Sequence, residues 1–432
     1  MPGAPALKGV HPMLPIGHLS TMPSRAASNP FGALGRHRNF RLFWIGQTLS
    51  LIGTWMQGMA QGWLALELSD SAFLVGLVAA AASLPVLLFS FPAGALVDRV
   101  RKLRLVTFMQ AGFLIQAAAL WFFTWTGHLS IGGLLALATL GGLLGAFEIP
   151  ARQTLVIELV GRDDLQAAIA LNSSGFNLAR VVGPAIGALI IGKLGLSWCF
   201  AINAFSFVTV LAGLALIRLP EGADDPSGAD RASGLDALRE GVTYVRENRA
   251  VRGLLGLIGV YAVLGGPYLT LMPVIARDQL GLGAQGYGLL LSSVGIGGVL
   301  GALALAAVSS RPGRGRMLLR SAAGFSVLLI AFSLTRGLGW AVPVLVLTGF
   351  LMILVNALAN GLLQTIVPDR LRGRMMATYS FLVVGLSQVI GAFGAGAVAH
   401  AAGANWAVGG AASLMLLATL GARVRYPELR EL

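Results

Sequence analysis

The sequence predicts an all-α integral membrane protein whose twelve transmembrane helices form two pseudo-symmetric bundles of six. Three observations predict this fold class. Of the 432 residues, 56% are hydrophobic and 11% are charged, whereas soluble domains carry about 25% charged residues. Apolar runs long enough to cross a bilayer recur along the whole chain. Basic residues gather in alternate connections between these runs, as expected of a chain that crosses a membrane repeatedly.

Twelve apolar runs follow one another, six on each side of one long polar interval. A helix needs about 20 apolar residues to cross the hydrocarbon core, whereas a strand of a membrane barrel needs about 10 with strict alternation. The lengths of the runs therefore indicate helices. The predicted spans are 40–67, 71–97, 104–127, 130–156, 164–193, 197–219, 251–277, 284–309, 316–335, 339–366, 372–402 and 404–422.

The polar segments outside the spans define the predicted organisation. Prolines among Gly, Ser and Ala favour disorder at the N-terminus. Within the long interval, Leu235, Leu238, Val242 and Val245 recur at helical spacing, which predicts an amphipathic surface helix. A regulatory docking site is the alternative interpretation of that interval. The predicted parts are a disordered cytoplasmic tail at 1–38, an N-terminal bundle at 39–220, a cytoplasmic linker at 221–250, a C-terminal bundle at 251–424 and a cytoplasmic tail at 425–432.

The distribution of basic residues predicts the orientation. Of the 31 Lys and Arg residues, 27 fall on one side of the predicted membrane. The other side holds Lys193, Arg277 and Arg336, and Arg180 lies within a span. The positive-inside rule therefore places both termini in the cytoplasm. The net charge of +13 is then a signal of topology, and we expect no nucleic-acid partner.

Several classes of function have no support in the sequence. Cys199 is the one cysteine, so the chain can form neither an internal disulfide nor a cysteine-based zinc site. The five histidines lie in tails or near span ends, without an H-E-x-x-H motif, and no phosphate-binding loop is present. We therefore expect no cofactor, no metal and no enzyme activity.

The two halves of the chain resemble each other. The segment 94–104, between the second and third spans, has a counterpart at 306–314, in which Arg311 takes the place of Arg99. The fifth span also has a counterpart in the eleventh, since the segment 387–392 resembles the segment 179–184. Two repeats of six helices in the same orientation suggest two bundles around a central site.

The connection between the second and third spans contains Gly94, Asp98, Arg99, Arg101 and Lys102. With twelve spans in two halves, this motif resembles the loop signature of the major facilitator superfamily. Physically, Gly94 would allow close helix approach, Asp98 could cap a helix or accept from the other half, and the basic residues could bind carboxylates and lipid phosphates. The resemblance implies that this loop holds the cytoplasmic side closed when the protein faces outward.

The fifth span resembles the antiporter motif of that superfamily. It carries Gly175, Gly183, Pro184 and Gly187, with Ala188 in place of the last glycine of the motif. Gly and Pro permit a kink and tight helix packing. Further segments, such as 39–47 and 367–374, are similar to the bacterial enterobactin exporters and macrolide-efflux proteins. The resemblance covers about 38–425 and implies export from a bacterial cytoplasmic (inner) membrane.

Polar residues on one face of a membrane helix usually face a cavity. In the first span, polar residues at steps of three and four form one stripe, about 21 Å long at 1.5 Å per residue. Hydrogen bonding between helices without substrate contact is the alternative. The predicted substrate-binding residues of the first, fifth and tenth spans are Gln47, Thr54, Gln57, Gln61, Asn177, Asn356 and Asn360.

Two acidic residues within or near spans, Glu67 and Glu148, are the predicted proton carriers. A buried, unpaired carboxylate can load and release protons near neutral pH. Glu148 could instead pair with Arg152 or Arg180 and act as a structural or gating charge. Arg180 is costly in a membrane unless it is paired, and we expect Glu148 or the Asp98 loop to be its partner and Arg180 to take part in gating.

Together these observations predict a monomeric secondary exporter of small amphipathic organic molecules, siderophore-like or drug-like. The expected mechanism is proton-coupled antiport by alternating access, with membrane lipids around the protein. A lysophospholipid or lipid flippase of the same fold is the main alternative, and a non-transporting membrane sensor is a remote one.

Overall fold

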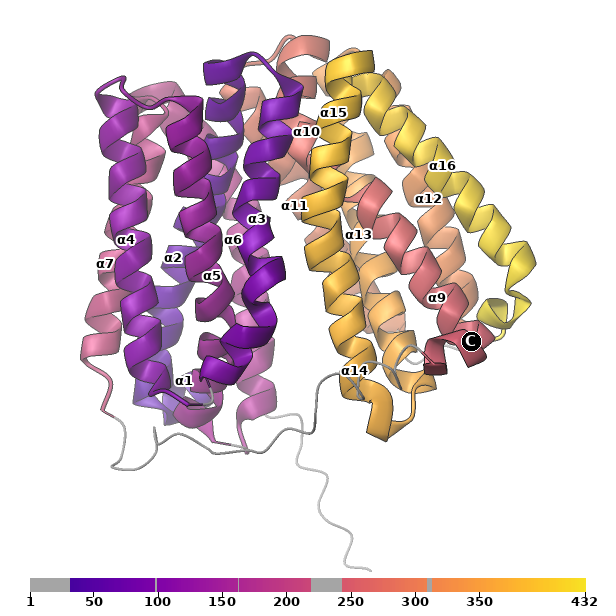
Figure 1. Ribbon diagram of the computed structural model, residues 1–432, viewed down its shortest axis with the longest axis horizontal. Helices are drawn as coiled ribbons and strands as arrows, with labels where there is room; N and C mark the ends of the chain where they lie inside the picture. The colour runs from indigo at the N-terminus through magenta and orange to yellow at the C-terminus, as the bar shows by residue number, and fades with distance from the viewer. Residues whose placement is uncertain (1–31, 98, 162, 219–242, 309–312) are drawn as a thin grey trace, which may run out of the picture.

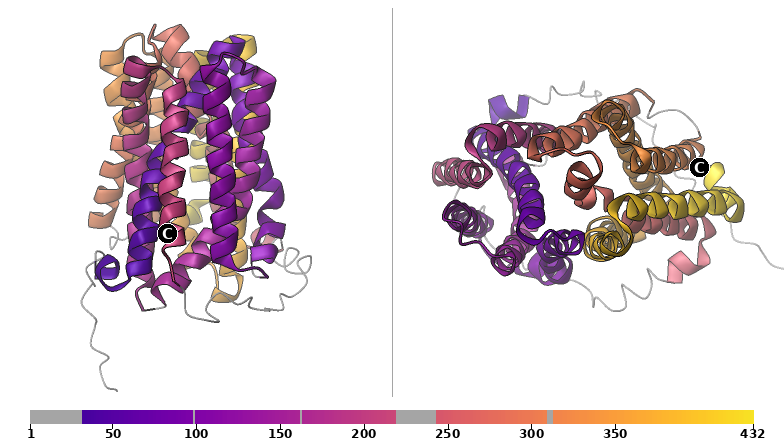
Figure 2. Two further views of the ribbon diagram at one scale, coloured as in Figure 1. Left: turned by 90° about the vertical axis from the view of Figure 1, so that its left-hand side faces the viewer. Right: turned by 90° about the horizontal axis from the view of Figure 1, so that it is seen from above.

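The computed structural model describes residues 32–97, 99–161, 163–218, 243–308 and 313–432, and the regular structure of these residues is helical. The long helices stand in two groups, one from each half of the chain (Figure 1). Figure 2 shows the same groups from one side and from above. In both groups the helix axes are broadly aligned, with successive spans running up and down, as expected of helices that cross one bilayer.

The helices of the N-terminal half pack on one another mostly in pairs that are not consecutive in the chain. Helix α2 packs on α6 and α7, α3 packs on α5, and α4 packs on α5 and α7. Ser130 caps α5, since its hydroxyl accepts a hydrogen bond from the amide of Gly133 at 3.1 Å. The half comprises α1 (Gly32–Arg36), α2 (Arg38–Ser69), α3 (Ala72–Val97), α4 (Lys102–Trp125), α5 (Ile131–Val160), α6 (Leu165–Leu194) and α7 (Ser197–Ala215).

The C-terminal half differs in having π-helical turns within two of its spans. Such turns are rare and mark local widening of a helix. Here α11 packs on α13, and α12 packs on α13 and α16. The half comprises α9 (Arg249–Val260), η1 (Tyr261–Gly265), α10 (Tyr268–Val274), η2 (Ile275–Gln279), α11 (Ala284–Val308), α12 (Arg314–Leu334), α13 (Leu338–Ile366), α14 (Asp369–Ser380), η3 (Phe381–Gly391), α15 (Ala392–Ala402), α16 (Ala404–Arg425) and η4 (Pro427–Arg430).

Among the described residues, 11 helical segments are long and apolar enough to cross a membrane. They correspond to every predicted span except the first. Helix α2 occupies the place of that first span and has 32 residues, which corresponds to about 48 Å at 1.5 Å per residue. Its glutamines and other polar side chains lower its hydropathy, although its length is ample for a span. The predicted all-α membrane fold is confirmed.

The two halves meet most closely at one end of the bundle. We call this the far end, where α2 ends and α3 begins; the terminal end is the opposite one, where α2 begins and α16 ends. At the far end, Trp63 stacks on Tyr287 with ring centroids 6.0 Å apart, and Phe73 meets Phe393 edge to face at 5.3 Å. Deeper in the bundle, a Cβ on Gly76 would lie 2.6 Å from the carbonyl oxygen of Ala392. These contacts close the far end.

Toward the terminal end the two halves separate. Figure 1 shows α3 and α14 well apart there, whereas α3 and α15 lie together at the far end. The contacts between α6 and α11 run from Gly192 against Gln285 at the far end to Arg180 against Gly298. The described contacts between the two halves therefore concentrate toward the far end, and the described chain begins and ends at the terminal end, where the ribbons of the two halves stand apart (Figure 1).

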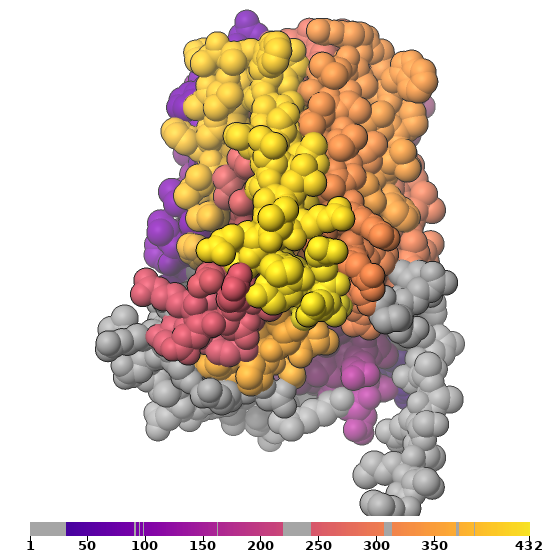
Figure 3. Space-filling view, turned by 90° about the vertical axis from the view of Figure 1, so that its right-hand side faces the viewer, coloured from indigo at the N-terminus to yellow at the C-terminus, as the bar shows by residue number. Residues whose placement is uncertain are grey.

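The structure adds detail at both chain ends. The predicted disordered tail reaches residue 38, but Gly32–Arg36 forms the helix α1. The predicted C-terminal tail packs on the bundle, because Leu429 is 1% exposed and Arg249 Nε lies 3.2 Å from Glu428 Oε1. Figure 3 shows this end of the chain beside α9, below α16. The predicted linker helix lies largely outside the described residues, of which 243–247 are helical.

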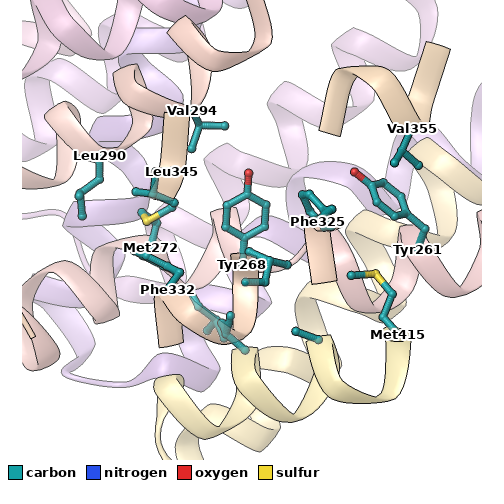
Figure 4. Close-up of a cluster of buried hydrophobic side chains, with 14 of the residues drawn as sticks. Tyr261, Tyr268, Met272, Leu290, Val294, Phe325, Phe332, Leu345, Val355 and Met415 are labelled. Atoms are coloured by element: carbon teal, nitrogen blue, oxygen red, sulfur yellow. The ribbon is translucent and has the colours of Figure 1, made fainter. Parts of the chain in front are cut away.

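Aromatic and sulfur-containing side chains fill the middle of the C-terminal half (Figure 4). Phe325 is fully buried, and its ring centroid lies 4.9 Å from that of Tyr261 and 6.1 Å from that of Tyr268. Met415 is fully buried beside them. We call these four residues the aromatic core.

Candidate functional site

The polar stripe of α2 contacts other helices of the N-terminal half. Gln57 is buried; its amide donates to Gln116 Oε1 at 3.1 Å and accepts from Asn203 Nδ2 at 2.8 Å. Gln47, also buried, accepts from Gln110 Nε2 at 3.4 Å. For Gln47 and Gln57 the geometry thus matches the alternative considered from the sequence, hydrogen bonding between helices.

At the Gln47 end of the stripe, the side chain of Gln110 connects α2 to a buried ion pair on α5. Glu148 is 5% exposed, and its Oε1 lies 2.9 Å from Nε of Arg152, one helical turn away. The same carboxylate oxygen accepts from Gln110 Nε2 at 3.2 Å. The sequence left Arg152 and Arg180 as possible partners of Glu148, and the structure places Arg152 there. We call the residues Gln47, Gln110, Glu148 and Arg152 the polar cluster; it joins α2, α4 and α5.

Three other predicted substrate-binding residues of the N-terminal half are more accessible. Thr54 is exposed, and its hydroxyl donates to the carbonyl of Ser50 at 2.9 Å. Gln61 is half-buried. Asn177 is half-buried on α6 and donates to the carbonyl of Ser173 at 2.8 Å. The hydrogen bonds of Thr54 and Asn177 are internal to one helix, so these two side chains do not depend on partners from other helices.

The two asparagines predicted in the C-terminal half lie on α13 and are half-buried. The hydroxyl of Tyr379 donates to the backbone carbonyl of Asn356 at 3.1 Å. The side chain of Asn360 accepts from the amide of Gln364, one turn further along the helix. The structure does not bring these asparagines into hydrogen bonds with the polar residues of α2.

Glu67, the other predicted proton carrier, has a different environment from Glu148. It is exposed near the far end of α2, and the indole N–H of Trp63 donates to its carboxylate. It therefore lacks the burial on which its predicted role depends, whereas Glu148 has that burial together with a cationic partner.

The predicted gating loop is described only in part, because Asp98 lies outside the described residues. Arg99 and Arg101 are exposed at the terminal end. Lys102 is buried, and its ammonium lies 3.5 Å from Glu158 Oε1 of α5. In this state a Cβ on Gly94 would have no described neighbour within 4 Å, so the close approach expected of this glycine is not formed here.

The glycines of the antiporter-like motif mark the packing of α6 on α2. A Cβ on Gly183 would lie 2.7 Å from Trp55 Cβ and 2.8 Å from the carbonyl oxygen of Ile52. Gly175 faces Thr48, and Gly187 faces Met56. Pro184 is buried within α6 on the side that meets Gly288 of α11. Small residues thus let α6 pack closely on α2 of its own half and on α11 of the other half.

Arg180 lies one turn before Pro184, at the contact between α6 and α11. A Cβ added to Gly298 would overlap Nη2 of Arg180. Among the described residues, its buried Nε and Nη2 have no hydrogen-bond partner. The expected pair with Glu148 does not form, because Glu148 is paired with Arg152.

The sequence reasoning missed an ion pair that links the two halves at the far end. Arg277 Nη2 lies 2.6 Å from Asp70 Oδ1, and Arg277 Nε lies 2.6 Å from Asp278 Oδ1. A cavity of ≈ 290 Å³ adjoins these groups and is also lined by Gln279, His400 and other residues. The signal was present, since Arg277 is one of three basic residues predicted on that side.

A second ion pair fixes α1 at the terminal end. Arg36 donates two hydrogen bonds to Asp164, at 2.7 and 3.0 Å, and His37 Nε2 lies 2.8 Å from the same carboxylate. The hydrogen bonds from Arg36, followed by that from His37, lower the pKa of Asp164 to about 2. Asp164 is therefore ionised throughout the physiological range.

Comparisons with known proteins agree with this geometry. Residues 28–432 match the model of a family described as transmembrane secretion effectors. The multidrug efflux pump Tap of Mycolicibacterium fortuitum is 29% identical over 381 residues, which cover 86% of this chain and 91% of that protein. The enterobactin exporter EntS of Shigella boydii is 24% identical over 343 residues, covering 79% and 81%.

Solved structures show the same fold. A bacterial homologue of the human lysosomal transporter Spinster, in an inward-facing and unoccupied conformation, superposes with a TM-score of 0.68 at 15% sequence identity. The superposition covers 92% of this chain and 98% of that one. At this identity the likeness concerns the fold alone.

Proposed function

Because the chain belongs to the transmembrane secretion effector family of the major facilitator superfamily, we propose that it exports small amphipathic organic molecules by proton-coupled alternating access. The observation that carries this proposal is the family match over residues 28–432. The names of two relatives, a multidrug efflux pump and an enterobactin exporter, favour drug-like or siderophore-like cargo. The chain is a multi-pass membrane transporter, and its relatives imply the bacterial inner membrane.

The contacts between the halves support alternating access. The far end is closed by Trp63 on Tyr287 and by Asp70 with Arg277, while the halves separate at the terminal end. With the terminal end in the cytoplasm, as the basic residues predict, this state would admit cargo from the cytoplasm. Release would then require the far-end contacts to break and the Asp98 loop to close the terminal end.

The polar cluster supports the proposed proton coupling. Glu148 and Arg152 neutralise each other within the N-terminal half, where an isolated charge would be costly. A proton on Glu148 would compete with Arg152 for the carboxylate. Proton binding could therefore release Arg152 and alter the contacts among α2, α4 and α5 that Gln110 and Gln47 maintain.

The function can be tested in inside-out membrane vesicles that contain the full-length protein. We expect respiration to drive accumulation of at least one of ethidium, tetracycline and dansyl-phenylalanine. Nigericin, which abolishes the pH gradient, should stop it. Glu148→Gln should reduce the proton-driven rate about tenfold or more, in line with loss of a proton-transfer group. Arg320→Gln, which changes an exposed arginine of α12, is the matched control.

The outcomes separate export from its coupling. If no probe accumulates above vesicles without the protein, the export proposal fails. If accumulation survives both nigericin and Glu148→Gln, export stands and proton coupling through Glu148 fails. Because Glu148→Gln leaves Arg152 unpaired, the double variant Glu148→Gln/Arg152→Gln provides a second test in which neither charge remains.

A further inference from the structure

Arg180 is a cation in the interior of the bundle whose counter-charge the described residues do not supply. It lies on α6 at the contact with α11, and the side chain as a whole is half-buried. Its Nε and Nη2 are fully shielded and have no hydrogen-bond partner among the described residues. A guanidinium stays protonated in proteins, and a buried charge is unfavourable unless it is paired.

The acidic side chains of neighbouring spans are already engaged. Glu148 pairs with Arg152, Glu158 pairs with Lys102, and Glu67 lies near the far end with Trp63. Tyr268 lies near Arg180, but a phenol is uncharged at neutral pH and does not supply a counter-charge. Its hydroxyl has the weak acceptor Met352 Sδ, at 3.7 Å, and Figure 4 shows that hydroxyl directed away from Phe332 and Met415.

The surroundings of Arg180 suit the anionic end of an amphipathic molecule. One turn before it, Phe176 is 44% exposed and meets Trp55 edge to face with ring centroids 5.5 Å apart. This aromatic pair offers an apolar surface one helical turn from Arg180. Because Gly298 has no side chain, there is room beside it for Nη2 of Arg180. A guanidinium binds a carboxylate through two parallel hydrogen bonds, which gives both strength and orientation.

We infer that Arg180 binds the anionic group of the exported molecule, a carboxylate or a similar oxyanion, at the contact between the two halves. This inference rests on the export function proposed above and names its substrate class: amphipathic organic anions. Because Arg180 and Gly298 belong to different halves, an anion held there would also couple cargo binding to the contact between them.

The test compares two probes that differ only in charge. Dansyl-phenylalanine carries a carboxylate, and dansyl-phenylalaninamide is its neutral counterpart. Binding is measured by dansyl fluorescence to the full-length protein in phosphatidylcholine nanodiscs. We expect Arg180→Gln to weaken binding of the carboxylate about tenfold or more, and binding of the amide less than about twofold. Arg180→Lys should retain part of the preference, because an ammonium lacks the planar fork.

Two further variants make the result specific. Arg320→Gln removes an exposed arginine from α12 and should leave both affinities unchanged. Gly298→Ala places a methyl group where Nη2 of Arg180 lies, so it should reduce the preference for the carboxylate without removing the charge. If Arg180→Gln fails to fold, Gly298→Ala carries the test. An unchanged carboxylate-to-amide ratio in the folded variants overturns the inference.

A lipid phosphate offers the same oxyanion chemistry, and a second arm distinguishes it. The protein is purified from phosphatidylglycerol-containing membranes, and the retained lipid is measured by mass spectrometry. We expect wild type and Arg180→Gln to retain equal amounts. Loss of bound phosphatidylglycerol in Arg180→Gln, with no change in the probe ratio, would assign the site to a headgroup and overturn the substrate class.

Failure of the inference and failure of the export proposal remain separable. If Arg180→Gln does not alter the probe ratio while vesicles still accumulate a probe, export stands and the anion site falls. If the wild type accumulates no probe but binds the carboxylate through Arg180, the site stands and export falls.

Discussion

The polar cluster of the N-terminal half and the aromatic core of the C-terminal half hold helices together by different chemistry. In the N-terminal half, the polar cluster and the bonds of Gln57 with Gln116 and Asn203 join α2, α4, α5 and α7. In the C-terminal half, the aromatic core joins η1, α10, α12 and α16 by packing alone. Lipid is as apolar as a leucine side chain, so polar bonds and close packing are the two available means of helix association. Only the polar means also provides groups that can bind protons.

The largest expected effect comes from removing the centre of the aromatic core. Phe325→Ala should lower the free energy of unfolding by about 3–5 kcal/mol, because a fully buried phenyl ring is lost and a cavity remains. Unfolding by SDS titration in mixed micelles measures this change. Phe108→Ala is the matched control, since Phe108 is 70% exposed. A loss as small as that of the control would show that packing does not hold this half together.

The ion pair of the polar cluster should rank next. Glu148→Gln leaves the largely buried Arg152 without its partner, and we expect a loss of about 3 kcal/mol in the same assay. Arg152→Gln leaves Glu148 unpaired and should cost a similar amount. The double variant should recover part of either loss, since neither charge is then orphaned. Additive losses would mean that the two charges are not coupled.

A smaller effect is expected from the hydrogen bonds of α2. Gln57→Leu removes two bonds that join α2 to α4 and α7, and bonds between membrane helices are worth about 0.6–1.7 kcal/mol each. Gln61→Leu, on the same face but half-buried, serves as control. If Gln57→Leu is neutral or stabilising, the N-terminal half resembles the C-terminal half more than its bonds suggest.

The smallest effect concerns a polar contact outside the membrane. The pKa of Asp164 is lowered to about 2, chiefly by hydrogen bonds from Arg36. A lowered pKa stabilises the folded form above the unfolded value of about 3.9, and this contribution is lost as the pH falls through about 2. Because Asp164 stays ionised from pH 8 to 5, its contribution to the docking of α1 should not change over that range. Docking should weaken below pH 4. The rate at which a cysteine-reactive probe labels the variant Ala33→Cys measures the docking of α1. With Asp164→Asn added, this labelling rate should become insensitive to acid.

The sequence was sufficient to predict the spans, because run length and hydropathy are properties of consecutive residues. The hydrogen-bond partners on other helices were harder to predict from the sequence. The stripe of Gln47, Thr54 and Gln57 was visible from its spacing, but Gln110, Gln116 and Asn203 lie on other spans, and periodicity does not reveal which faces meet. Their signal was weaker: isolated polar residues within the third and sixth apolar runs.

Contacts that depend on the state of the transporter could not be predicted at all. Asp70 and Arg277 are far apart in sequence and meet because the far end is closed. The same holds for Arg180, whose position against Gly298 results from the contact of α6 with α11. Asp98, the residue that carried the predicted gate, lies outside the described residues, so its role remains a prediction.

The pair of Asp70 and Arg277 has a consequence for the speed of transport. Asp70 ends α2 in the left-handed region, with φ of 48°, a conformation that aspartate tolerates better than most residues. Its side chain is 82% exposed, and an ion pair in such a position contributes at most about 1 kcal/mol. A bias of that size shifts an equilibrium only about fivefold, and added salt reduces it further. The ion pair is thus only a small, salt-sensitive part of what holds the far end closed, beside the contacts of Trp63 with Tyr287 and of Phe73 with Phe393, so breaking it should not limit how fast that end opens.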